Sequence, residues 1–187
     1  MGEKRGGFTP TSFTASKSSY ETRTLAGDVW TRHRPDRVRA LIQRVTNAAV
    51  DAGGERLGAI DCGLLVLIAA GPDDGPKDAA WMAGKVARLR IFSDAAGKMN
   101  LALADVGGSV LCVSQFTLYG DTSRGNRPSF IGAAPPQLGE QLVEAFVREL
   151  RALGVEVECG RFGADMQVTL TNDGPVTIWI DSAARGE

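Results

Sequence analysis

The stretch from Ser109 to Phe130 is the feature that most constrains what this 187-residue chain can fold into. Its first half, SVLCVSQF, is rich in β-branched residues and predicts a buried strand. The strand delivers four hydrogen-bonding side chains within six positions: Ser114, Gln115, Thr117 and Tyr119. If the extended conformation continues that far, alternation places Ser114 on one face of the sheet and the other three on the opposite face.

The second half of the stretch, GDTSRGNRPSF, predicts a loop. It is punctuated by glycine, carries the cations Arg124 and Arg127, and ends in an aromatic side chain. A core strand that runs into a polar, basic loop is a common way to hold a binding site on a rigid scaffold. The sequence therefore predicts a binding site where this strand ends.

A polar N-terminal segment precedes what we expect to be a single domain. Residues 1–37 are dense in Ser, Thr and Gly and lack periodicity, so we expect a disordered extension or a segment added by the choice of start site. Residues 38–182 have the length of one domain, and 183–187 form a short tail. If translation begins at Val38, an intact-mass measurement on the native protein will find residues 1–37 absent.

Apolar periodicity predicts a sheet with two helices. We expect a hairpin over 48–60 that turns at Gly53-Gly54, a polar loop over 91–100, and strands at 38–45, 63–70, 109–116 and 155–162. A first helix begins at Pro76, with a cap at Asp74 or Gly75 and a core stripe of Ala79, Met82, Val86 and Leu89. A second helix over 136–153 ends at Gly154 and shows one apolar face: Leu138, Leu142, Phe146, Leu150 and Leu153.

The last part of the domain, 166–182, predicts two short strands joined at Asn172-Asp173-Gly174-Pro175. A Gly-Pro pair between strands removes ladder hydrogen bonds. The joint is therefore a turn, an edge, or a cis peptide with a function, and the residues alone leave these alternatives open.

The charge balance limits the classes of function. Residues 38–187 hold fourteen Lys or Arg against eighteen Asp or Glu, which argues against non-specific coating of nucleic acid. Local positive patches remain, either Arg124 with Arg127 or a second group formed by Arg88, Arg90 and Lys98, and each is either an RNA contact or ordinary solvated surface. No apolar run approaches the roughly 20 residues of a membrane span, and no signal-peptide core is present, so we expect neither membrane insertion nor export.

The residue types also restrict the chemistry. The single histidine, His33, lies in the N-terminal segment, so a catalytic imidazole is not expected in the domain. Cys62, Cys112 and Cys159 form no CxxC pair and predict buried, reduced thiols rather than ligands or nucleophiles. We expect no metal and no cofactor, because ligand spacing and phosphate-binding glycine motifs are absent. An enzyme of this composition would act through hydroxyls, amides, backbone groups and carboxylates such as Asp121, Asp165 or Asp173, without an evident general base.

Seven blocks of the sequence resemble the D-aminoacyl-tRNA deacylases. SQFTL (114–118) and NDGPVT (172–177) look like the two signature motifs of that family. Five supporting blocks match in order and spacing: ALIQRV (40–45), GLLVL (63–67), RIFSDAAGKMN (90–100), RPSF (127–130) and GRFGADMQV (160–168). The resemblance covers 38–182 and implies an α/β fold with a mixed, largely antiparallel, barrel-like sheet and two main helices.

The resemblance also implies an activity. Members hydrolyse the ester between a D-amino acid and the 3′-terminal adenosine of tRNA, and also mischarged glycyl-tRNA, as cytoplasmic proofreading in translation. They are homodimers, and each subunit inserts a Gly-cis-Pro motif, here Gly174 and Pro175, into the site of its partner. There the two carbonyls would bind the substrate's amino group and exclude an L side chain, with Arg44 bracing the motif.

The remaining site residues follow from the same resemblance. Phe162, Met166 and Phe130 would contribute to substrate binding, and Ser114, Gln115 and Phe116 would line the reacting centre, with backbone amides as an oxyanion hole. Thr117 is an alternative nucleophile, but we favour water assisted by the ribose 2′-hydroxyl, because an unactivated hydroxyl is a poor nucleophile. A catalytically silent RNA-end or small-molecule binding module and a general esterase stand as rival functions, and a deacylation assay separates all three.

Overall fold

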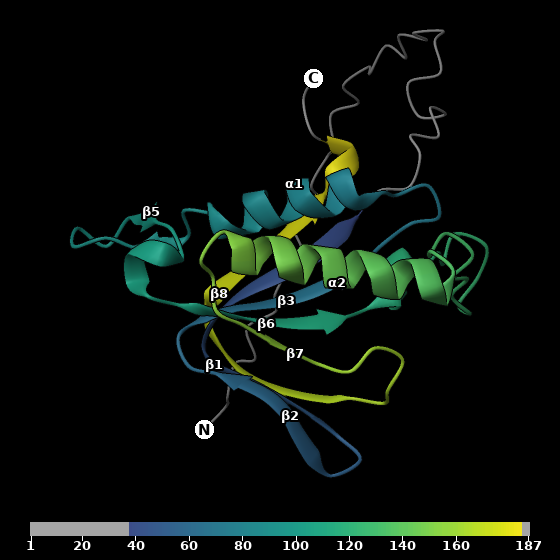
Figure 1. Cartoon of the computed structure of the whole chain (residues 1–187), viewed down its shortest axis with the longest axis horizontal. Coiled ribbons are helices and arrows are strands. Elements are labelled where there is room, and N and C mark those ends of the chain that lie inside the picture. Colours follow the sequence, from purple (N-terminus) through teal and green to yellow (C-terminus); the bar gives the residue numbers. More distant parts are fainter. Residues whose placement is uncertain (1–37, 185–187) are drawn as a thin grey trace, which may run out of the picture. The chain divides into compact units, whose positions relative to one another are not determined.

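The computed structural model describes residues 38–184, which form a mixed α/β fold (Figure 1). Residues 1–37 and 185–187 lie outside the described residues. The expectations of a disordered extension and of a C-terminal tail therefore concern parts of the chain that the structure does not describe, apart from 183 and 184. His33 lies in that undescribed part as well.

Six strands form the main sheet, and β1 lies at its centre. The strands are β1 (Arg39–Ala52), β2 (Glu55–Ile60), β3 (Gly63–Ala69), β6 (Ser109–Ser114), β7 (Val157–Cys159) and β8 (Gln167–Asp181). Antiparallel pairing joins β1 to β2 and β3 on one side and to β8 on the other. The sheet then continues through β6 and β7, which run parallel to β3.

The two ends of this strand order approach each other, so the sheet nearly closes into a barrel. A Cβ added to Gly58 of β2 would lie 3.1 Å from the Cβ of Glu158 in β7. Three of the pairings in the main sheet are antiparallel and two are parallel. The expected mixed, largely antiparallel, barrel-like sheet is confirmed.

The hairpin from β1 to β2 turns where the sequence predicts. Gly53 and Gly54 have φ values of 58° and 83°, a left-handed conformation that suits a two-residue turn and favours glycine. The strand before the turn is longer than predicted, because 39–45 and the first arm of the predicted hairpin form one continuous strand, Arg39–Ala52.

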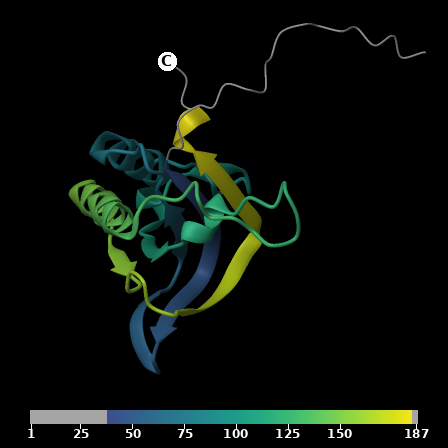
Figure 2. The same cartoon turned by 90° about the vertical axis from the view of Figure 1, so that its right-hand side faces the viewer.

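Both helices, α1 (Pro76–Ala87) and α2 (Pro136–Ala152), lie side by side on one face of the sheet (Figures 1 and 2). The predicted start of α1 is confirmed, since Gly75 is the N-cap residue and Pro76 occupies the first turn. Side chains from both helices and from the sheet form one core, which includes Ile42, Leu64, Val66, Met82 and Phe146. Each predicted stripe is one residue too long: Leu89 follows the end of α1 and is only partly buried, and Leu153 is 50% exposed.

The opposite face of the sheet buries a second, smaller core of Val45, Val50, Leu65, Leu111 and Val113. Because β3 and β6 are covered on both faces, neither strand alternates between apolar and polar residues. This explains the unbroken apolar runs GLLVLIAA and SVLCV.

Three predicted segments differ in the structure. The predicted loop 91–100 contains most of a two-stranded sheet, β4 (Phe92–Ser93) and β5 (Met99–Leu101), followed by the 3₁₀-helix η1 (Ala104–Val106). Only Val157–Cys159 of the predicted strand 155–162 is extended. The pair of strands predicted at 166–182 is a single strand, β8, with a bulge.

The cysteines differ in their surroundings. Cys112 is buried, Cys159 is half-buried, and Cys62 is exposed in the bend between β2 and β3. The prediction of a buried thiol is therefore wrong for Cys62. Separately, no helix among the described residues combines the length and the apolar character that a membrane span requires.

Candidate active site

The stretch that follows β6 changes conformation at Gln115. The last ladder contact is the Gln115 N–H, which donates to the Ile68 carbonyl at 2.8 Å. Next comes a 3₁₀-helix, η2 (Phe116–Tyr119), whose first turn closes with the Leu118 N–H donating to the Gln115 carbonyl at 3.1 Å. The expected alternation through Tyr119 is wrong, because β3 ends at Ala69 and offers no further partner.

A cavity of about 600 Å³ lies where three segments converge. The carboxyl end of β6 forms one wall, the residues leading into α2 form another, and the loop from β7 to β8 forms the third. Six of the ten predicted site residues line it: Ser114, Gln115, Phe116, Phe130, Phe162 and Met166. The long loop between η2 and α2 extends from the same region in Figure 2.

Two glycines make room for the apolar side chains of this cavity. A Cβ added to Gly139 on α2 would lie 3.4 Å from the Phe162 ring. A Cβ added to Gly160 would lie 2.5 Å from the sulfur of Met166, a distance that forces a shift. Small residues at these positions therefore set where the apolar wall stands.

The polar side of the cavity contains few ionisable groups. Asp165 is the only ionisable side chain among its lining residues, and no histidine occurs among residues 38–184. The Gln115 side-chain amide donates to the Thr117 hydroxyl, and Thr117 itself is exposed beside the cavity rather than part of its lining. The arrangement can orient a substrate and donate hydrogen bonds, but it offers no imidazole to take up a proton.

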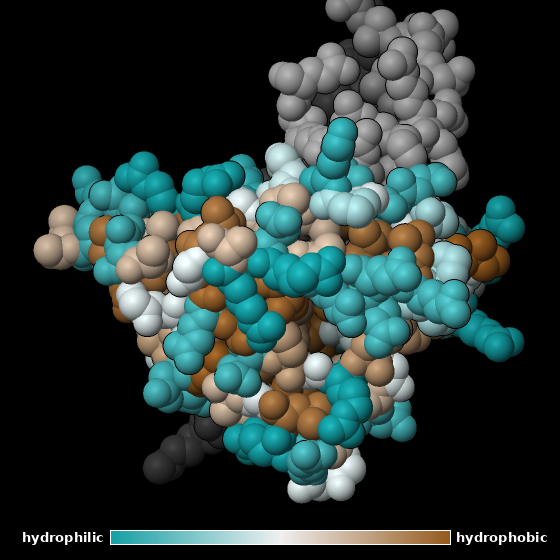
Figure 3. Space-filling view, in the orientation of Figure 1, coloured by the Kyte–Doolittle hydropathy of each residue, from teal (hydrophilic) through white to brown (hydrophobic). Residues whose placement is uncertain are grey.

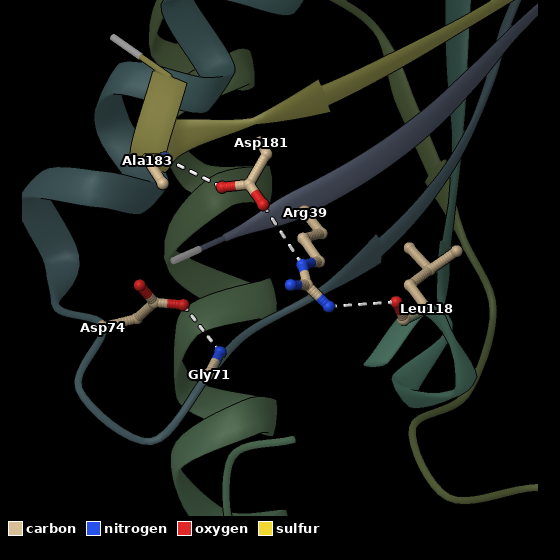
Figure 4. A network of polar contacts seen from close by, with 6 residues as sticks. All are labelled: Arg39, Gly71, Asp74, Leu118, Asp181 and Ala183. Carbon is tan, nitrogen blue, oxygen red and sulfur yellow. Dashed lines mark hydrogen bonds and ion pairs between the residues drawn. The ribbon is translucent and has the colours of Figure 1, made fainter. Parts of the chain in front are cut away.

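Arg39 connects η2 to the sheet (Figure 4). Its Nε lies 3.2 Å from an Asp181 carboxylate oxygen on β8, and its Nη1 donates to the Leu118 carbonyl at 3.3 Å. Its guanidinium also lies 4.2 Å from the centre of the Tyr119 ring. Sequence reasoning missed this residue. Arg39 lies opposite Asp181 only because β1 and β8 pair there.

Figure 4 also shows Asp74, whose contact with Gly71 is separate from those of Arg39. Its carboxylate accepts a hydrogen bond of 2.6 Å from the Gly71 N–H, and the residue is 7% exposed. Burial raises the pKa of Asp74 to about 6.

Gly174 and Pro175 lie on a different part of the surface. Asn172 pairs with Val45 and Thr177 with Gln43, so the four residues 173–176 bulge opposite Arg44 alone. The Gly174–Pro175 peptide is cis, both residues are exposed, and neither lines the cavity of its own chain.

The bulge is tightly held. Arg44 Nε lies 3.0 Å from the Asp173 carbonyl oxygen and 2.8 Å from a carboxylate oxygen of the same residue. Arg44 also donates to the Ile91 carbonyl, which connects the bulge to the segment before β4. The Asn172 amide donates to the carbonyls of Arg44, at 2.9 Å, and Val176, at 3.1 Å. The structure thus places Arg44 against the Gly-Pro segment and apart from the cavity.

A smaller hollow of about 430 Å³ adjoins the main cavity between α2 and β7, and shares Ser114 and Phe162 with it. Figure 3 shows apolar surface in a hollow below α2, bordered by hydrophilic side chains.

Burial and the neighbouring Cys159 raise the pKa of the Cys112 thiol, and burial raises the pKa of the Cys159 thiol, so neither is a ready thiolate. No cluster of metal-ligating side chains occurs within the part of the chain that the structure describes.

Comparisons with known proteins find relatives of this chain. A sequence model of the family described as D-Tyr-tRNA(Tyr) deacylase matches residues 41–181. The D-aminoacyl-tRNA deacylase of Lacticaseibacillus casei is 57% identical over 148 residues, which cover 79% of this chain and 100% of that protein. The enzyme of the same name from Dinoroseobacter shibae is 59% identical over 144 residues, covering 77% of this chain and 99% of that protein.

Two solved structures share the fold. A protein named c-Myc DNA Unwinding Element Binding Protein has a TM-score of 0.71 and 40% identity, covering 76% of this chain and 97% of that one. A probable eukaryotic D-amino acid tRNA deacylase has a TM-score of 0.69 over 77% of this chain and 98% of its own, and at 17% identity it supports the fold alone.

Proposed function

Because the chain belongs to the D-Tyr-tRNA(Tyr) deacylase family, we propose that it hydrolyses the ester bond of D-aminoacyl-tRNA and releases the D-amino acid and the tRNA. It is thus a hydrolase of the aminoacyl-tRNA ester. The observation that carries the proposal is the cavity at the end of β6, which gathers Ser114, Gln115 and Phe116 against an aromatic wall. We expect this reaction to take place in the cytoplasm, where tRNA is charged and used.

The cavity suits the 3′-terminal adenosine and its ester. Phe130, Phe162 and Met166 give an apolar wall against which a base can stack, since every base has a π-face. Ser114 and Gln115 place hydroxyl and amide groups on the opposite wall, where ribose and ester oxygens need hydrogen-bond partners.

The chemistry follows from what the cavity contains. We propose that water attacks the ester carbonyl, that the N–H groups of Phe116 and Thr117 stabilise the oxyanion, and that the ribose 2′-hydroxyl helps to position the water. A helix leaves its first N–H groups without an intrahelical acceptor, and these two residues begin η2. The acyl–oxygen bond then breaks, and the departing 3′-oxygen takes the proton that the water has lost.

Thr117 as the nucleophile is the weaker alternative. Its hydroxyl accepts a hydrogen bond from Gln115, and none of the groups described around it is a base that would remove its proton. If Thr117 attacked, an acyl-enzyme would form and Thr117→Ala would be inactive. We propose instead that Gln115 and Thr117 orient the turn and the substrate.

Chiral selection is proposed to come from a second copy of the chain. The Gly174–Pro175 segment is exposed, tightly held by Arg44 and Asn172, and absent from its own cavity. Inserted into the cavity of a partner subunit, its carbonyls would bind the substrate's amino group and leave no room for an L side chain. Glycine has no side chain to exclude, so glycyl-tRNA would also be accepted.

A deacylation assay tests the proposal. Labelled D-tyrosyl-tRNA should lose its label, the L-isomer should persist, and small acyl esters that lack the terminal adenosine should remain intact. Gln115→Ala should lower turnover more than tenfold, whereas the control Gln141→Ala on the exposed face of α2 should not. Binding of the tRNA without release of the label would favour the silent binding module, and rapid hydrolysis of small esters would favour the general esterase. Light scattering that finds a monomer under assay conditions would refute the cross-subunit model.

A further inference from the structure

Apolar side chains continue outward from the mouth of the cavity. Phe116 and Phe130 line the cavity, yet they remain 59% and 36% exposed, and the next residue, Ile131, is 91% exposed. The two rings pack edge to face with their centroids 5.2 Å apart. We call these three residues the outer platform. Exposed aromatic residues beside a binding cavity indicate that the bound molecule extends beyond it.

The loop from 121 to 130 brings positive charge to the same place. A pair of backbone hydrogen bonds between Asp121 and Ser129, of 2.8 and 2.9 Å, closes its base. Arg124 and Arg127 are exposed on this loop, and among residues 38–184 neither forms an ion pair. Hydrogen bonds with Ser123, and to a smaller extent the charge of Arg124, lower the pKa of the Asp121 carboxyl on the same loop. Both guanidinium groups are nevertheless exposed and outside any ion pair among the described residues, so they are available for an anion.

One other border of the cavity carries the opposite charge, because Asp165 lies on the loop between β7 and β8. The adjoining hollow below α2 is close to neutral: Glu140 and Glu144 line it together with Arg148 and Arg151. A polyanion that leaves the cavity is therefore repelled at Asp165 and attracted toward the loop 121–130. The charges favour an exit along that loop.

This inference rests on the proposed function. When the terminal adenosine fills the cavity, the preceding nucleotide lies at its mouth, because the two are joined by one phosphate. We propose that the base of this penultimate nucleotide stacks on the outer platform and that Arg124 and Arg127 hold the phosphates on either side of it. Single-stranded RNA is commonly bound in this way, by stacking on aromatic side chains beside basic groups. The occupant of this surface is thus the single-stranded 3′ end of the tRNA substrate.

Two substrates separate this surface from the cavity. D-tyrosyl-tRNA contains the nucleotides that the outer platform and the loop would bind, whereas the 3′-D-tyrosyl ester of adenosine does not. The double variant Arg124→Gln/Arg127→Gln should raise KM for the tRNA about tenfold or more and leave hydrolysis of the adenosine ester unchanged. The slope of log KM against log salt should fall by about 1.4, since each phosphate contact to a single strand contributes about 0.7.

The matched control is Lys77→Gln/Lys85→Gln, which removes two exposed charges from α1. Equal KM values for the loop variant and this control would overturn the inference and leave the proposed function intact. An equal loss on both substrates would also overturn it, because the loop would then support the cavity rather than bind RNA. A wild-type protein inactive on both substrates would remove the proposed function itself.

Stacking is tested separately with Ile131→Ala, which changes the outer platform without touching the cavity lining. The variant should raise KM for intact tRNA about fivefold or more and have no further effect on a tRNA that lacks the penultimate base. Additive effects of the variant and the missing base would show that Ile131 does not contact that base, and would refute this part of the inference.

Discussion

Replacing Arg39 by Met tests how the structure holds η2, the turn at which we propose the reacting centre. The substitution keeps most of the side chain's length and removes the ion pair with Asp181, the hydrogen bond to the Leu118 carbonyl and the stacking on Tyr119. Asp181 is left with solvent and with the Ala183 N–H at 2.8 Å, so no charge is stranded in the interior. The main loss is the connection between η2 and the sheet.

The magnitude follows from the geometry. A hydrogen bond to a charged group contributes about 1.5–3 kcal/mol, and an exposed cation–π contact about 0.5–1 kcal/mol. The ion pair adds little, because its two side chains remain 25% and 24% exposed. We expect the free energy of unfolding to fall by about 2 kcal/mol, and Tm by about 4–8 °C for a domain of this size.

The effect on catalysis should exceed the effect on stability. If η2 shifts by a fraction of an ångström, the N–H groups of Phe116 and Thr117, which we propose as the oxyanion hole, no longer point at the developing oxyanion. Misplacement on that scale lowers rates by about 10- to 100-fold. Urea denaturation measures the first effect, and single-turnover deacylation of D-tyrosyl-tRNA at 25 °C measures the second.

Arg56→Met is the matched control. Arg56, on β2, also pairs with an aspartate, Asp51 near the end of β1, at 2.6 Å, but its side chain is 57% exposed. We expect Arg56→Met to lower the free energy of unfolding by less than about 1 kcal/mol and to leave the deacylation rate unchanged. The reasoning is refuted if Arg39→Met is no more destabilising than this control, or if it lowers stability while the rate at 25 °C stays at the wild-type value.

Three further predictions concern other parts of the molecule. Gly174→Ala places a Cβ 2.0 Å from the Val176 nitrogen, so the backbone must shift. The urea midpoint and the discrimination between D- and L-aminoacyl-tRNA should both fall, and wild-type values of both would contradict this packing. Thr117→Ala should retain most of the single-turnover rate while Gln115→Ala does not, and complete loss in Thr117→Ala with intact tRNA binding would restore Thr117 as nucleophile. The folded pKa of Asp74 is raised to about 6 from 3.8, so its favourable contribution is complete below pH 3.8 and is lost as the pH rises through 6. Between pH 4 and pH 7.5, the free energy of unfolding of Asp74→Asn should therefore rise by about 2–3 kcal/mol relative to that of the wild type. If the two proteins give parallel curves of unfolding free energy against pH, the carboxyl titrates normally.

The elements that the sequence predicts best are those in which a local pattern and the tertiary environment agree. The run GLLVLIAA is uniformly apolar because β3 is buried on both faces, and Gly53-Gly54 adopts the positive φ angles that a two-residue hairpin requires. The Gly75-Pro76 pair similarly marks the start of α1. In each case, the residues that favour the local conformation are the ones that the fold needs there.

The elements that the sequence predicts wrongly depend on long-range partners. SQFTLY looks like the continuation of a strand, but β3 ends before it and the chain turns into η2. Asn172 to Val176 looks like a joint between strands, but β1 pairs on both sides of it and makes it a bulge. Arg39 escapes sequence reasoning because its partners are 142 and 79 residues away. No window of neighbouring residues contains that information.

The distribution of charge explains how an acidic domain can act on a nucleic acid. An enzyme that coated RNA would need a broad basic face, and residues 38–187 carry more acidic than basic groups. A deacylase needs only the end of the strand, so the two guanidinium contacts that we propose at the mouth are enough to orient it, while Asp165 disfavours the path along the loop between β7 and β8. The inner cavity can then remain nearly free of charge, which strengthens the hydrogen bonds that backbone N–H groups offer to an oxyanion. We therefore expect Asp165→Lys to tighten the binding of tRNA and of RNA ends in general. The same variant should show a smaller preference for D-aminoacyl-tRNA over other RNA ends.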